Sequence, residues 1–231
     1  MMRLIFVASD PMEFRGIAAR TEETRKSRIG VDWAISARLN GHEVLLAANG
    51  VGWRRAAVAV DAAHHAFPAD AVISTGFCGA LDPQLAIGDA VVATCVAGPE
   101  HRYPALPLHG SHASTGLVIS MDHVVGTAAE KRALREKGGS VVEMEAAGVA
   151  NRAQALGLDF FCARAVTDLA TEDMANDFNE VLRPDGHFDT IGIFRHLSKR
   201  PIARLPELIR LRQNCARAAK SLGELFADCR F

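Results

Sequence analysis

Short apolar runs alternate with segments of helical periodicity along this chain, which is the pattern of an α/β protein. The apolar runs predict strands at Arg3–Ala8, Val31–Leu39, Glu43–Ala48, Ala71–Ser74, Gly88–Thr94, Gly116–Ser120 and Asp159–Val166. Spacing of three to four residues predicts helices from Met12, over Trp53–Phe67, over Thr127–Lys137 and from Leu208 to Leu225. Asn40-Gly41 is typical of a hairpin turn. Thr127, with Glu130 three residues later, predicts a capping box at the start of an exposed helix. We expect loops at Arg20–Arg28 and, as a lid, at Glu100–Thr115.

The stretch Val141–Ala150 holds two carboxylates where a strand pattern changes into a helical one. Val141 and Val142 are β-branched and favour a buried strand. Glu143 and Glu145 follow, each between apolar neighbours. Strand-to-helix junctions of α/β proteins face the ligand crevice, so this pair is a candidate for a binding site. The alternative is that both acids only help to start the helix, although one capping residue is the commoner start signal.

Two further acids follow predicted strands. Glu13 comes just after the first strand, and Asp168 ends the run that begins at Asp159. The carboxyl ends of strands are where open α/β sheets present functional groups. A helix-capping role remains the alternative for Asp168.

Two glycine-rich segments also follow strands. Asn49–Gly52 partly matches a dinucleotide-binding fingerprint, but Arg55 replaces the third glycine and the next strand ends in Ser74-Thr75 without an acid. These departures argue against a nicotinamide cofactor. Thr75-Gly76-x-x-Gly79 offers backbone N–H groups to a polar ligand, and a plain tight turn is the alternative.

Composition narrows the class of protein. The chain has 231 residues, 49% of them hydrophobic, with 26 basic against 27 acidic side chains. Length and composition favour a soluble α/β domain with a sizeable core, and nothing in the charge points to nucleic acid. No apolar run is long enough to cross a membrane, and the N-terminus lacks the features of a signal peptide. The five scattered cysteines suit reduced thiols, so we expect a cytoplasmic protein.

Two further features of the sequence are candidates for binding sites. His101, His109 and His112 have no carboxylate or thiol at ligand spacing, so we expect no metal. From Arg195 to Arg230 there are nine Lys or Arg against three Asp or Glu, with an apolar stripe at helical spacing. We expect an amphipathic helix packed on the domain, and weak contact with an anionic membrane surface is the alternative.

Four motifs in order identify a family resemblance. They are Thr75-Gly76-x-x-Gly79, Gly88-Asp89-x-Val91-Val92, Val142-Glu143-Met144-Glu145-Ala146 and Arg164-Ala165-Val166-Thr167-Asp168. Together they resemble the nucleoside phosphorylase/nucleosidase superfamily, which includes purine nucleoside phosphorylases and methylthioadenosine/S-adenosylhomocysteine nucleosidase. The resemblance runs from Arg3 to about Asp168. Leu182–Gly186, Arg200-Pro201 and Leu205–Leu211 resemble the hopanoid-associated phosphorylase subgroup.

The resemblance implies a fold and an assembly. We expect a three-layer α/β fold with a mixed, partly barrel-like central sheet flanked by helices, and a homo-oligomer. A single phosphorylase-like domain would span residues 1–231, with a basic amphipathic helical region from about residue 187.

The resemblance also implies roles for single residues. Asp168 would protonate N7 of a purine, and Glu13 would activate water. Glu145 would bind the ribose hydroxyls with Met144 against the sugar, and Glu143 would support them. The remaining substrate-binding positions are Thr75, Gly76, Phe77, Gly79 and Val124, of which Val124 stands where the nucleosidases place an aromatic wall.

The resemblance leaves water and phosphate open as the nucleophile. Ser74 and Phe77 stand where hexameric purine nucleoside phosphorylases have an Arg and a Ser, which weakens a phosphate site. A carboxylate at Glu13 would repel phosphate and favours hydrolysis. The possible substitutes for binding phosphate are Arg15, Arg38 and Arg54.

The expected reaction is cleavage of the N-glycosidic bond of an adenosine-type nucleoside. No cofactor is expected beyond phosphate as a possible co-substrate, and the subgroup implies a lipid-linked 5′ group. The alternative is a non-catalytic nucleoside-binding protein on the same fold, which would not need an acid at the leaving base.

Overall fold

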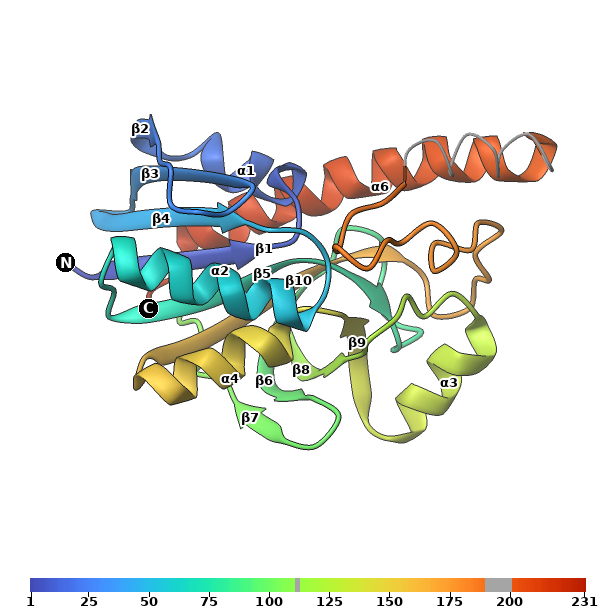
Figure 1. Ribbon diagram of the computed structural model, residues 1–231. Coiled ribbons are helices and arrows are strands. Elements are labelled where there is room, and N and C mark those ends of the chain that lie inside the picture. Colours follow the sequence, from blue (N-terminus) through green and yellow to red (C-terminus); the bar gives the residue numbers. More distant parts are fainter. Residues whose placement is uncertain (111–112, 190–200) are drawn as a thin grey trace.

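The computed structural model describes residues 1–110, 113–189 and 201–231, with side chains from residue 204 in the last range (Figure 1). The strands are β1 (Arg3–Ala8), β2 (Glu22–Lys26), β3 (Trp33–Leu39), β4 (His42–Ala48), β5 (Ala71–Ala80), β6 (Ala90–Ala97), β7 (Arg102–Pro104), β8 (Ser114–Ser120), β9 (Gly139–Glu143) and β10 (Asp159–Asp168). The helices are η1 (Pro11–Phe14, a 3-10 turn), α1 (Arg15–Ala18), α2 (Trp53–Ala66), α3 (Ala128–Glu136), α4 (Ala146–Leu156) and α6 (Pro201–Asp228).

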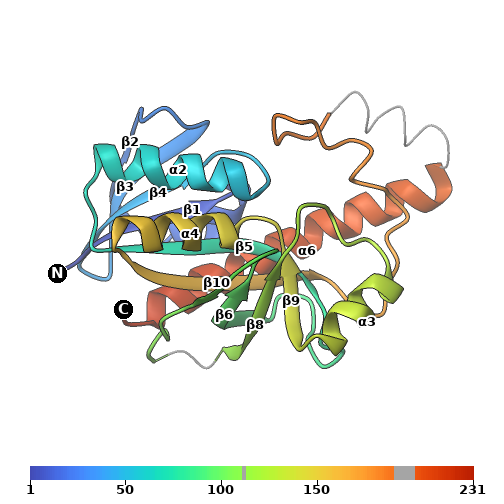
Figure 2. The same ribbon diagram turned by 60° about the horizontal axis from the view of Figure 1, so that its bottom comes forward.

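Five strands close into a ring. β5 pairs with β10 on one side and β9 on the other, while β10 pairs with β6, β6 with β8, and β8 with β9. The pairings of β10 with β6 and of β5 with β9 are antiparallel, and the other three are parallel. From β5 the sheet continues outward through β1, β4, β3 and β2 (Figure 2). The predicted mixed, partly barrel-like sheet is confirmed.

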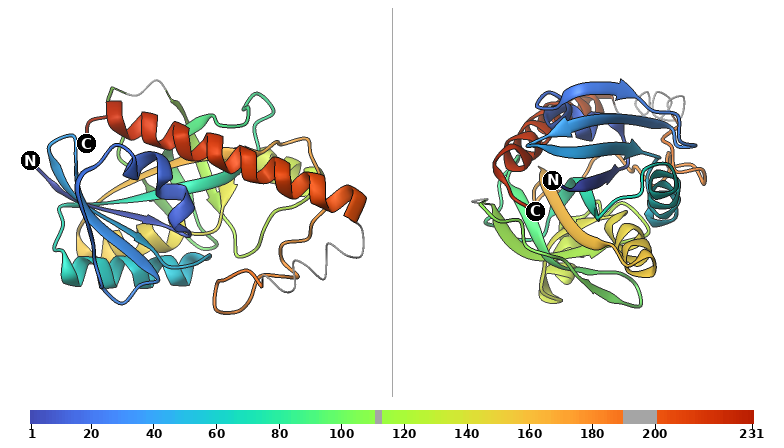
Figure 3. Two further views of the ribbon diagram at one scale, coloured as in Figure 1. Left: turned by 90° about the horizontal axis from the view of Figure 1, so that it is seen from above. Right: turned by 90° about the vertical axis from the view of Figure 1, so that its left-hand side faces the viewer.

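Helices cover both faces of this sheet. α2 and α4 pack on one face, and α1 and α6 lie on the other (Figure 3). The residues of β1 alternate between the two apolar clusters, because successive side chains of a strand point to opposite faces. Phe6 of β1, for example, meets Phe226 of α6 edge-on at 5.1 Å between ring centroids. A sheet buried on both faces explains the nearly continuous apolar runs in the sequence.

Helix α6 crosses α1 at a contact between two glycines. A Cβ atom added to Gly223 would lie 2.3 Å from the backbone carbon and oxygen of Gly16. Only a residue without a Cβ allows the two backbones to approach so closely. This contact helps to set the position of α6 on the domain.

Most of the expected elements are confirmed. The hairpin turns at Asn40 and Gly41, both with positive φ (51° and 78°). Of the predicted capping box, one half is found: the Thr127 hydroxyl caps α3 and accepts a hydrogen bond from the Glu130 N–H at 3.2 Å, whereas Glu130 Oε1 pairs with the His123 ring at 2.7 Å. The predicted C-terminal amphipathic helix is α6, while the part of that region at residues 190–200 lies outside the described residues.

Four local expectations were wrong. Arg20–Arg28 contains strand β2, which is exposed throughout and therefore carries no apolar alternation. The strand expected at Ala71–Ser74 runs on as β5 through Thr75–Gly79 to close the barrel, so the alternative of a tight turn there is wrong. The expected lid holds β7 and the start of β8, with residues 111–112 outside the description. Helix α3 is not simply exposed, because Lys131 on it is fully buried.

The glycine contact under α6 leads to a stability prediction. Alanine is a better helix former than glycine, so propensity alone predicts that Gly223→Ala stabilises the protein. We expect the opposite, a loss of about 2 kcal/mol in the free energy of unfolding, because the new methyl group meets the Gly16 backbone.

Urea denaturation measures this effect. Gln213→Ala, at an exposed position of the same helix, is the matched control and should change stability little. A variant Gly223→Ala as stable as the control would contradict the close packing of α6 on α1.

Candidate active site

A cavity of about 370 Å³ lies at the carboxyl ends of β1, β9 and β10. It is lined by residues from widely separated parts of the chain: Ser9, Asp10, Met12, Glu13, Gly50, Val51, Phe77, Cys78, Gly79, His123, Val124, Val125, Val142, Glu143, Met144, Glu145, Thr167, Asp168, Met174, Phe178, Gly186, His187, Phe188, Leu211 and Cys215. The acids predicted from the sequence therefore converge on one space. Thr75 and Gly76 were also expected to line the ligand, but they do not line this cavity and lie in β5 behind it.

Glu13 is held by the turn that follows β1. Its Oε2 accepts hydrogen bonds from the N–H groups of Ser9 (2.8 Å) and Asp10 (3.0 Å) and from the Ser9 hydroxyl (2.8 Å). Its Oε1 accepts from the N–H of Phe77 in β5 at 2.7 Å. Burial raises the pKa of Glu13, and the hydrogen bond from Phe77 and the charge of Arg164 oppose that rise. The carboxyl group is thus fixed in orientation, and its burial favours the protonated form more than in a free Glu.

Glu143 and Arg164 form an ion pair inside the barrel. Arg164 of β10 is 0% exposed, and its Nη2 donates to Glu143 Oε2 at 2.6 Å and to the Ser74 hydroxyl at 2.7 Å. Burial lowers the pKa of Arg164, but Glu143 together with the other acidic groups around it raises the pKa more, so the guanidinium group stays charged. Glu143 Oε2 also accepts from the N–H groups of Glu145 and Ala146, both at 2.8 Å. Glu143 therefore supports the start of α4 and also lines the cavity.

Gly76 allows Arg164 to approach Glu13. A Cβ atom at Gly76, where φ is 144°, would lie 2.5 Å from Glu13 Oε1 and 2.6 Å from Arg164 Nη1. Within the described part of the chain, Nη1 and Nε of Arg164 have no hydrogen-bond partner. The guanidinium group thus keeps donors to spare beside Glu13. The role of Gly76 is to make room for this pair behind the cavity.

Glu145 lies at the start of α4 and faces the start of α2. Its Oε1 accepts from the N–H of Gly52 at 2.9 Å. Burial, and next the charge of Glu143, raise the pKa of Glu145 from 4.5 to about 8. Without a ligand the carboxyl group is therefore mainly protonated at neutral pH, whereas the sequence suggested a carboxylate.

Asp168 ends β10 where the pairing with β5 shifts register after Val166. Such a shift turns a side chain away from the regular sheet. Asp168 Oδ2 accepts from the ammonium group of Lys131 at 2.6 Å, and Oδ1 accepts from the Thr167 hydroxyl at 3.1 Å. Burial raises the pKa of Asp168, and Lys131 opposes that rise. Asp168 does not cap a helix, because no helix begins there among the described residues.

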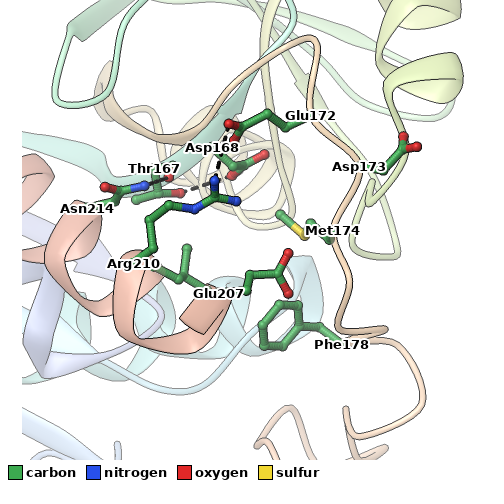
Figure 4. Close-up of a pocket in the computed structure, with 10 residues that line it drawn as sticks. Thr167, Asp168, Glu172, Asp173, Met174, Phe178, Glu207, Arg210 and Asn214 are labelled. Carbon is green, nitrogen blue, oxygen red and sulfur yellow. Dashed lines mark hydrogen bonds and ion pairs between the residues drawn. The ribbon is translucent and has the colours of Figure 1, made fainter. Parts of the chain in front are cut away.

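A smaller cavity of about 20 Å³, enough for about one water molecule, lies beside Asp168 (Figure 4). Arg210 extends into it from α6 and pairs with Glu172 at 3.4 Å. Asn214, one turn further along α6, donates to the carbonyl oxygen of Thr167 at 2.9 Å. Helix α6 therefore holds the strand end that carries Asp168.

The rest of the main cavity is largely apolar. Three of the positions predicted from the sequence line it: Met144, Phe77 and Val124. The segment after β10 and helix α6 add an apolar wall of Met174, Phe178, Phe188 and Leu211. No arginine lines it among the described residues, so Arg15, Arg38 and Arg54 do not serve as a phosphate site there. In the same described ranges, no cluster of three or more His, Cys, Asp or Glu side chains is placed to hold a metal ion.

Sequence reasoning missed two buried cations. Arg164 is the only charged residue in the apolar run from Phe160 to Val166, and a lone charge within a buried strand is a signal of a structural or functional pair. Lys131 shares a face of α3 with Leu134, three residues on, which was the sign that it points inward.

The raised pKa of Glu145 leads to a prediction on pH and stability. The folded protein keeps a proton on Glu145 between pH 4.5 and about 8, where the unfolded chain has lost it. The stability that this proton contributes to the folded protein is fully present below pH 4.5 and is lost as pH rises through about 8. Glu145→Gln cannot lose a proton. We therefore expect the free energy of unfolding of the variant to increase relative to that of the wild type as pH rises, by on the order of a few kcal/mol at pH 8.5.

Urea denaturation at pH 5 and pH 8.5 measures this difference. Glu224→Gln, at an exposed position of α6, is the control and should give a difference that hardly depends on pH. The prediction is wrong if the difference between wild type and Glu145→Gln is equally independent of pH.

Comparison with known proteins identifies the family and the fold of this chain. The sequence matches the Phosphorylase superfamily over residues 3–111 and 101–185. The 5′-methylthioadenosine/S-adenosylhomocysteine nucleosidase of Staphylococcus saprophyticus is 29% identical over 175 residues, which are 63% of this chain and 77% of that protein. The nucleosidase of the same name from Staphylococcus aureus is 25% identical over 62% of this chain and 76% of its own length.

Solved structures show the same fold. The S-adenosylhomocysteine nucleosidase of Streptococcus pyogenes, in complex with 5-methylthiotubericidin, has a TM-score of 0.74 at 20% identity, covering 100% of this chain and 98% of that one. The 5′-methylthioadenosine/S-adenosylhomocysteine nucleosidase of Neisseria meningitidis, in complex with methylthio-immucillin-A, has a TM-score of 0.72 at 23% identity, covering 98% and 99%. The chain belongs to the phosphorylase superfamily and is an enzyme of the nucleoside phosphorylase and nucleosidase type, as its motifs predicted.

Proposed function

We propose that this enzyme cleaves the N-glycosidic bond of an adenosine-type nucleoside with water as the nucleophile. The observation that carries the proposal is the placement of Glu13, Glu145 and Asp168 around one largely apolar cavity. The relatives named above, which are nucleosidases, support the same reaction.

Asp168 would act on the leaving base. A purine departs with the electron pair of the C1′–N9 bond and leaves more easily when N7 is protonated. General acids of this kind contribute factors of about 100 to 10,000. An ordinary Asp is ionised at neutral pH, but burial raises the pKa of Asp168 and so favours its acid form.

Glu145 and Met144 would hold the sugar. Glu145 is fixed by Gly52 at 2.9 Å and has one oxygen left for the ribose hydroxyls. When it ionises with a ligand in place, its negative charge stabilises the cationic sugar of the transition state. Met144 beside it offers a polarizable, apolar surface for the ring.

Glu13 would take the proton from water as the water oxygen attacks C1′. Its two oxygens are oriented by the N–H groups of Phe77, Ser9 and Asp10, so the base is set in place before substrate arrives. Phosphate would need free cationic groups in the cavity. The Arg164 guanidinium group, which binds Glu143 and Ser74 through Nη2, does not line the cavity. The described site therefore favours water.

A panel of adenosine-type nucleosides, with and without phosphate, tests this function. We expect release of adenine that does not depend on phosphate. Asp168→Asn should reduce kcat by about 100- to 10,000-fold, because the base leaves without its proton. Glu13→Gln should also reduce kcat strongly, while an adenine-containing inhibitor still binds to both variants.

Asp159→Asn is the matched control for Asp168→Asn, because Asp159 is exposed at the other end of β10. Adenine release that requires phosphate would overturn the choice of water. Tight nucleoside binding without any release would instead support the non-catalytic alternative.

We further propose that the substrate carries a bulky apolar 5′ group, of the lipid-linked kind that the hopanoid-associated subgroup implies. Support comes from the apolar wall of Met174, Phe178, Phe188 and Leu211 in the cavity. Phe178 and Phe188 pack edge-on, with ring centroids 6.0 Å apart. Such a wall would bury an alkyl chain but offers nothing to a charged 5′ group.

The same proposal includes where the enzyme works and how it assembles. Leu205 and Ile209 of α6 are 50% and 53% exposed, next to basic residues of that helix, which supports weak contact with an anionic membrane surface. No described helix is both long and apolar enough to span a membrane. A cytoplasmic homo-oligomer is proposed from the family resemblance, and the free cysteines fit a reducing compartment.

A series of 5′-alkylthioadenosines tests the apolar wall. We expect kcat/KM to rise with alkyl length. Phe178→Ala should lower kcat/KM for the longest member by roughly tenfold or more, because burial of an aromatic contact is lost. Adenosine, which lacks the alkyl group, is the control substrate and should be affected little. An equal loss on adenosine and on the long-chain substrate would argue against a 5′ site at Phe178.

A further inference from the structure

Helix α3 carries a lysine whose side chain is completely buried. Lys131 is 0% exposed, and its Nζ donates to Asp168 Oδ2 at 2.6 Å and to the carbonyl oxygen of Leu169 at 2.7 Å. A third oxygen, the carbonyl of Glu172, lies at 3.5 Å. Lysine is almost never fully buried unless it is paired. Here the ammonium group is built into the end of β10.

This arrangement leaves one oxygen of Asp168 for a ligand. Oδ2 is enclosed by Lys131 and by β5, since a Cβ atom at Gly79 would lie 2.8 Å from it. Oδ1 accepts only the Thr167 hydroxyl at 3.1 Å among the described contacts. Because the Asp168 side chain is 14% exposed and lines the main cavity, Oδ1 is the oxygen that can meet a base.

Building on the function proposed above, we propose that Lys131 is the positioning residue of the general acid. Its ammonium group fixes Oδ2, presents Oδ1 to the leaving purine and stabilises the carboxylate that remains. In this step the Oδ1–H bond breaks, an N–H bond forms on the base, and the base keeps the electron pair of the broken C1′–N9 bond. Lys131 retains its protons; after the products leave, Glu13 releases to solvent the proton it took from water, and Asp168 regains one from solvent.

The other groups around Asp168 do not supply this charge. From the segment after β10, Glu172 raises the pKa of Asp168, and it is itself paired with Arg210 of α6. Glu207 of α6, a second carboxylate of the small cavity, accepts from the N–H groups of Ala175 and Asn176. Asp173, the remaining acid there, accepts from the Ala128 N–H at 2.7 Å.

The titratable groups on the other elements around Asp168 do not supply this charge either. In β5, burial raises the pKa of the Cys78 thiol well above its usual value, so it stays neutral. His123, which lies before α3 and lines the main cavity, holds Asp122 at 2.8 Å and Glu130 at 2.7 Å. Among the described residues that contact the Asp168 carboxylate, Lys131 is the one cation.

The pH profile of kcat/KM tests the inference. A general acid must be protonated, so activity falls as pH rises through its pKa. Removing Lys131 removes the charge that lowers the pKa of Asp168. We therefore expect Lys131→Met to lose activity at pH 7 by tenfold or more and to shift the basic limb of the profile to higher pH by about one unit or more. Arg132→Met, the exposed neighbour on α3, removes the same charge and should leave the profile unchanged.

A double-mutant cycle separates positioning from structure. If Lys131 acts through Asp168, Lys131→Met should cause no further loss in a protein that already carries Asp168→Asn. Lys131→Gln is the second variant, should the methionine variant fold poorly, because it keeps a donor to Oδ2 but removes the charge. A loss of activity with an unmoved basic limb, or a further loss beside Asp168→Asn, would overturn the proposal.

A direct titration separates this proposal from the proposed function. Carbon-13 NMR of labelled aspartates, with Asp168 identified by the signal missing in Asp168→Asn, gives its pKa in the wild type and in the Lys131 variants. An upward shift in the Lys131 variants is expected. An unchanged pKa would overturn the role of Lys131 whether or not the wild type cleaves nucleosides. A wild type that cleaves none would overturn the proposed function alone.

Discussion

The ion pair between Arg164 and Glu143 is the interaction on which the rest of the site depends. Two buried charges are tolerated only when each is paired and hydrogen-bonded, because removing them from water costs several kcal/mol per ion. The pair joins β10 to β9, two strands that do not pair directly in the sheet. Glu143 also binds the first N–H groups of α4 and so places Glu145. Because Arg164 also lies beside Glu13 across Gly76, one guanidinium group sets the geometry of the acids at the sugar end.

Charge is divided between the two ends of the cavity. Burial raises the pKa of Glu13, Glu145 and Asp168 alike, but different cations oppose the rise. Arg164 opposes the rise in the pKa of Glu13 and Glu145, whereas Lys131 opposes the rise in the pKa of Asp168. Separate cations allow a base and an acid to work in one cavity, because the proton affinity of each can be set by its own surroundings.

Much of the fold and of the acid set could be predicted from the chain. β-branched runs and helical spacing are local properties, so β1, the hairpin at Asn40-Gly41, α2 and the junction at Glu143–Glu145 were found in their places. Acids that follow strands were likewise visible as Glu13 and Asp168. Strand β2 and the continuation of β5 through Gly76 were missed, because their pairing is made by backbone atoms of distant segments and leaves no apolar pattern.

The sequence by itself determined which residue types stand at strand ends and that the chain belongs among the nucleoside phosphorylases and nucleosidases. Tertiary structure alone decided which of them meet. Closure of β5, β10, β6, β8 and β9 into a ring buried Arg164 against Glu143, and the packing of α3 buried Lys131 against Asp168. Folding also raised the pKa of Glu145, so this residue keeps a proton that it would lose in the unfolded chain. The physical reason is that proton affinity depends on burial and on charges brought together by folding, and neither is present in the local sequence.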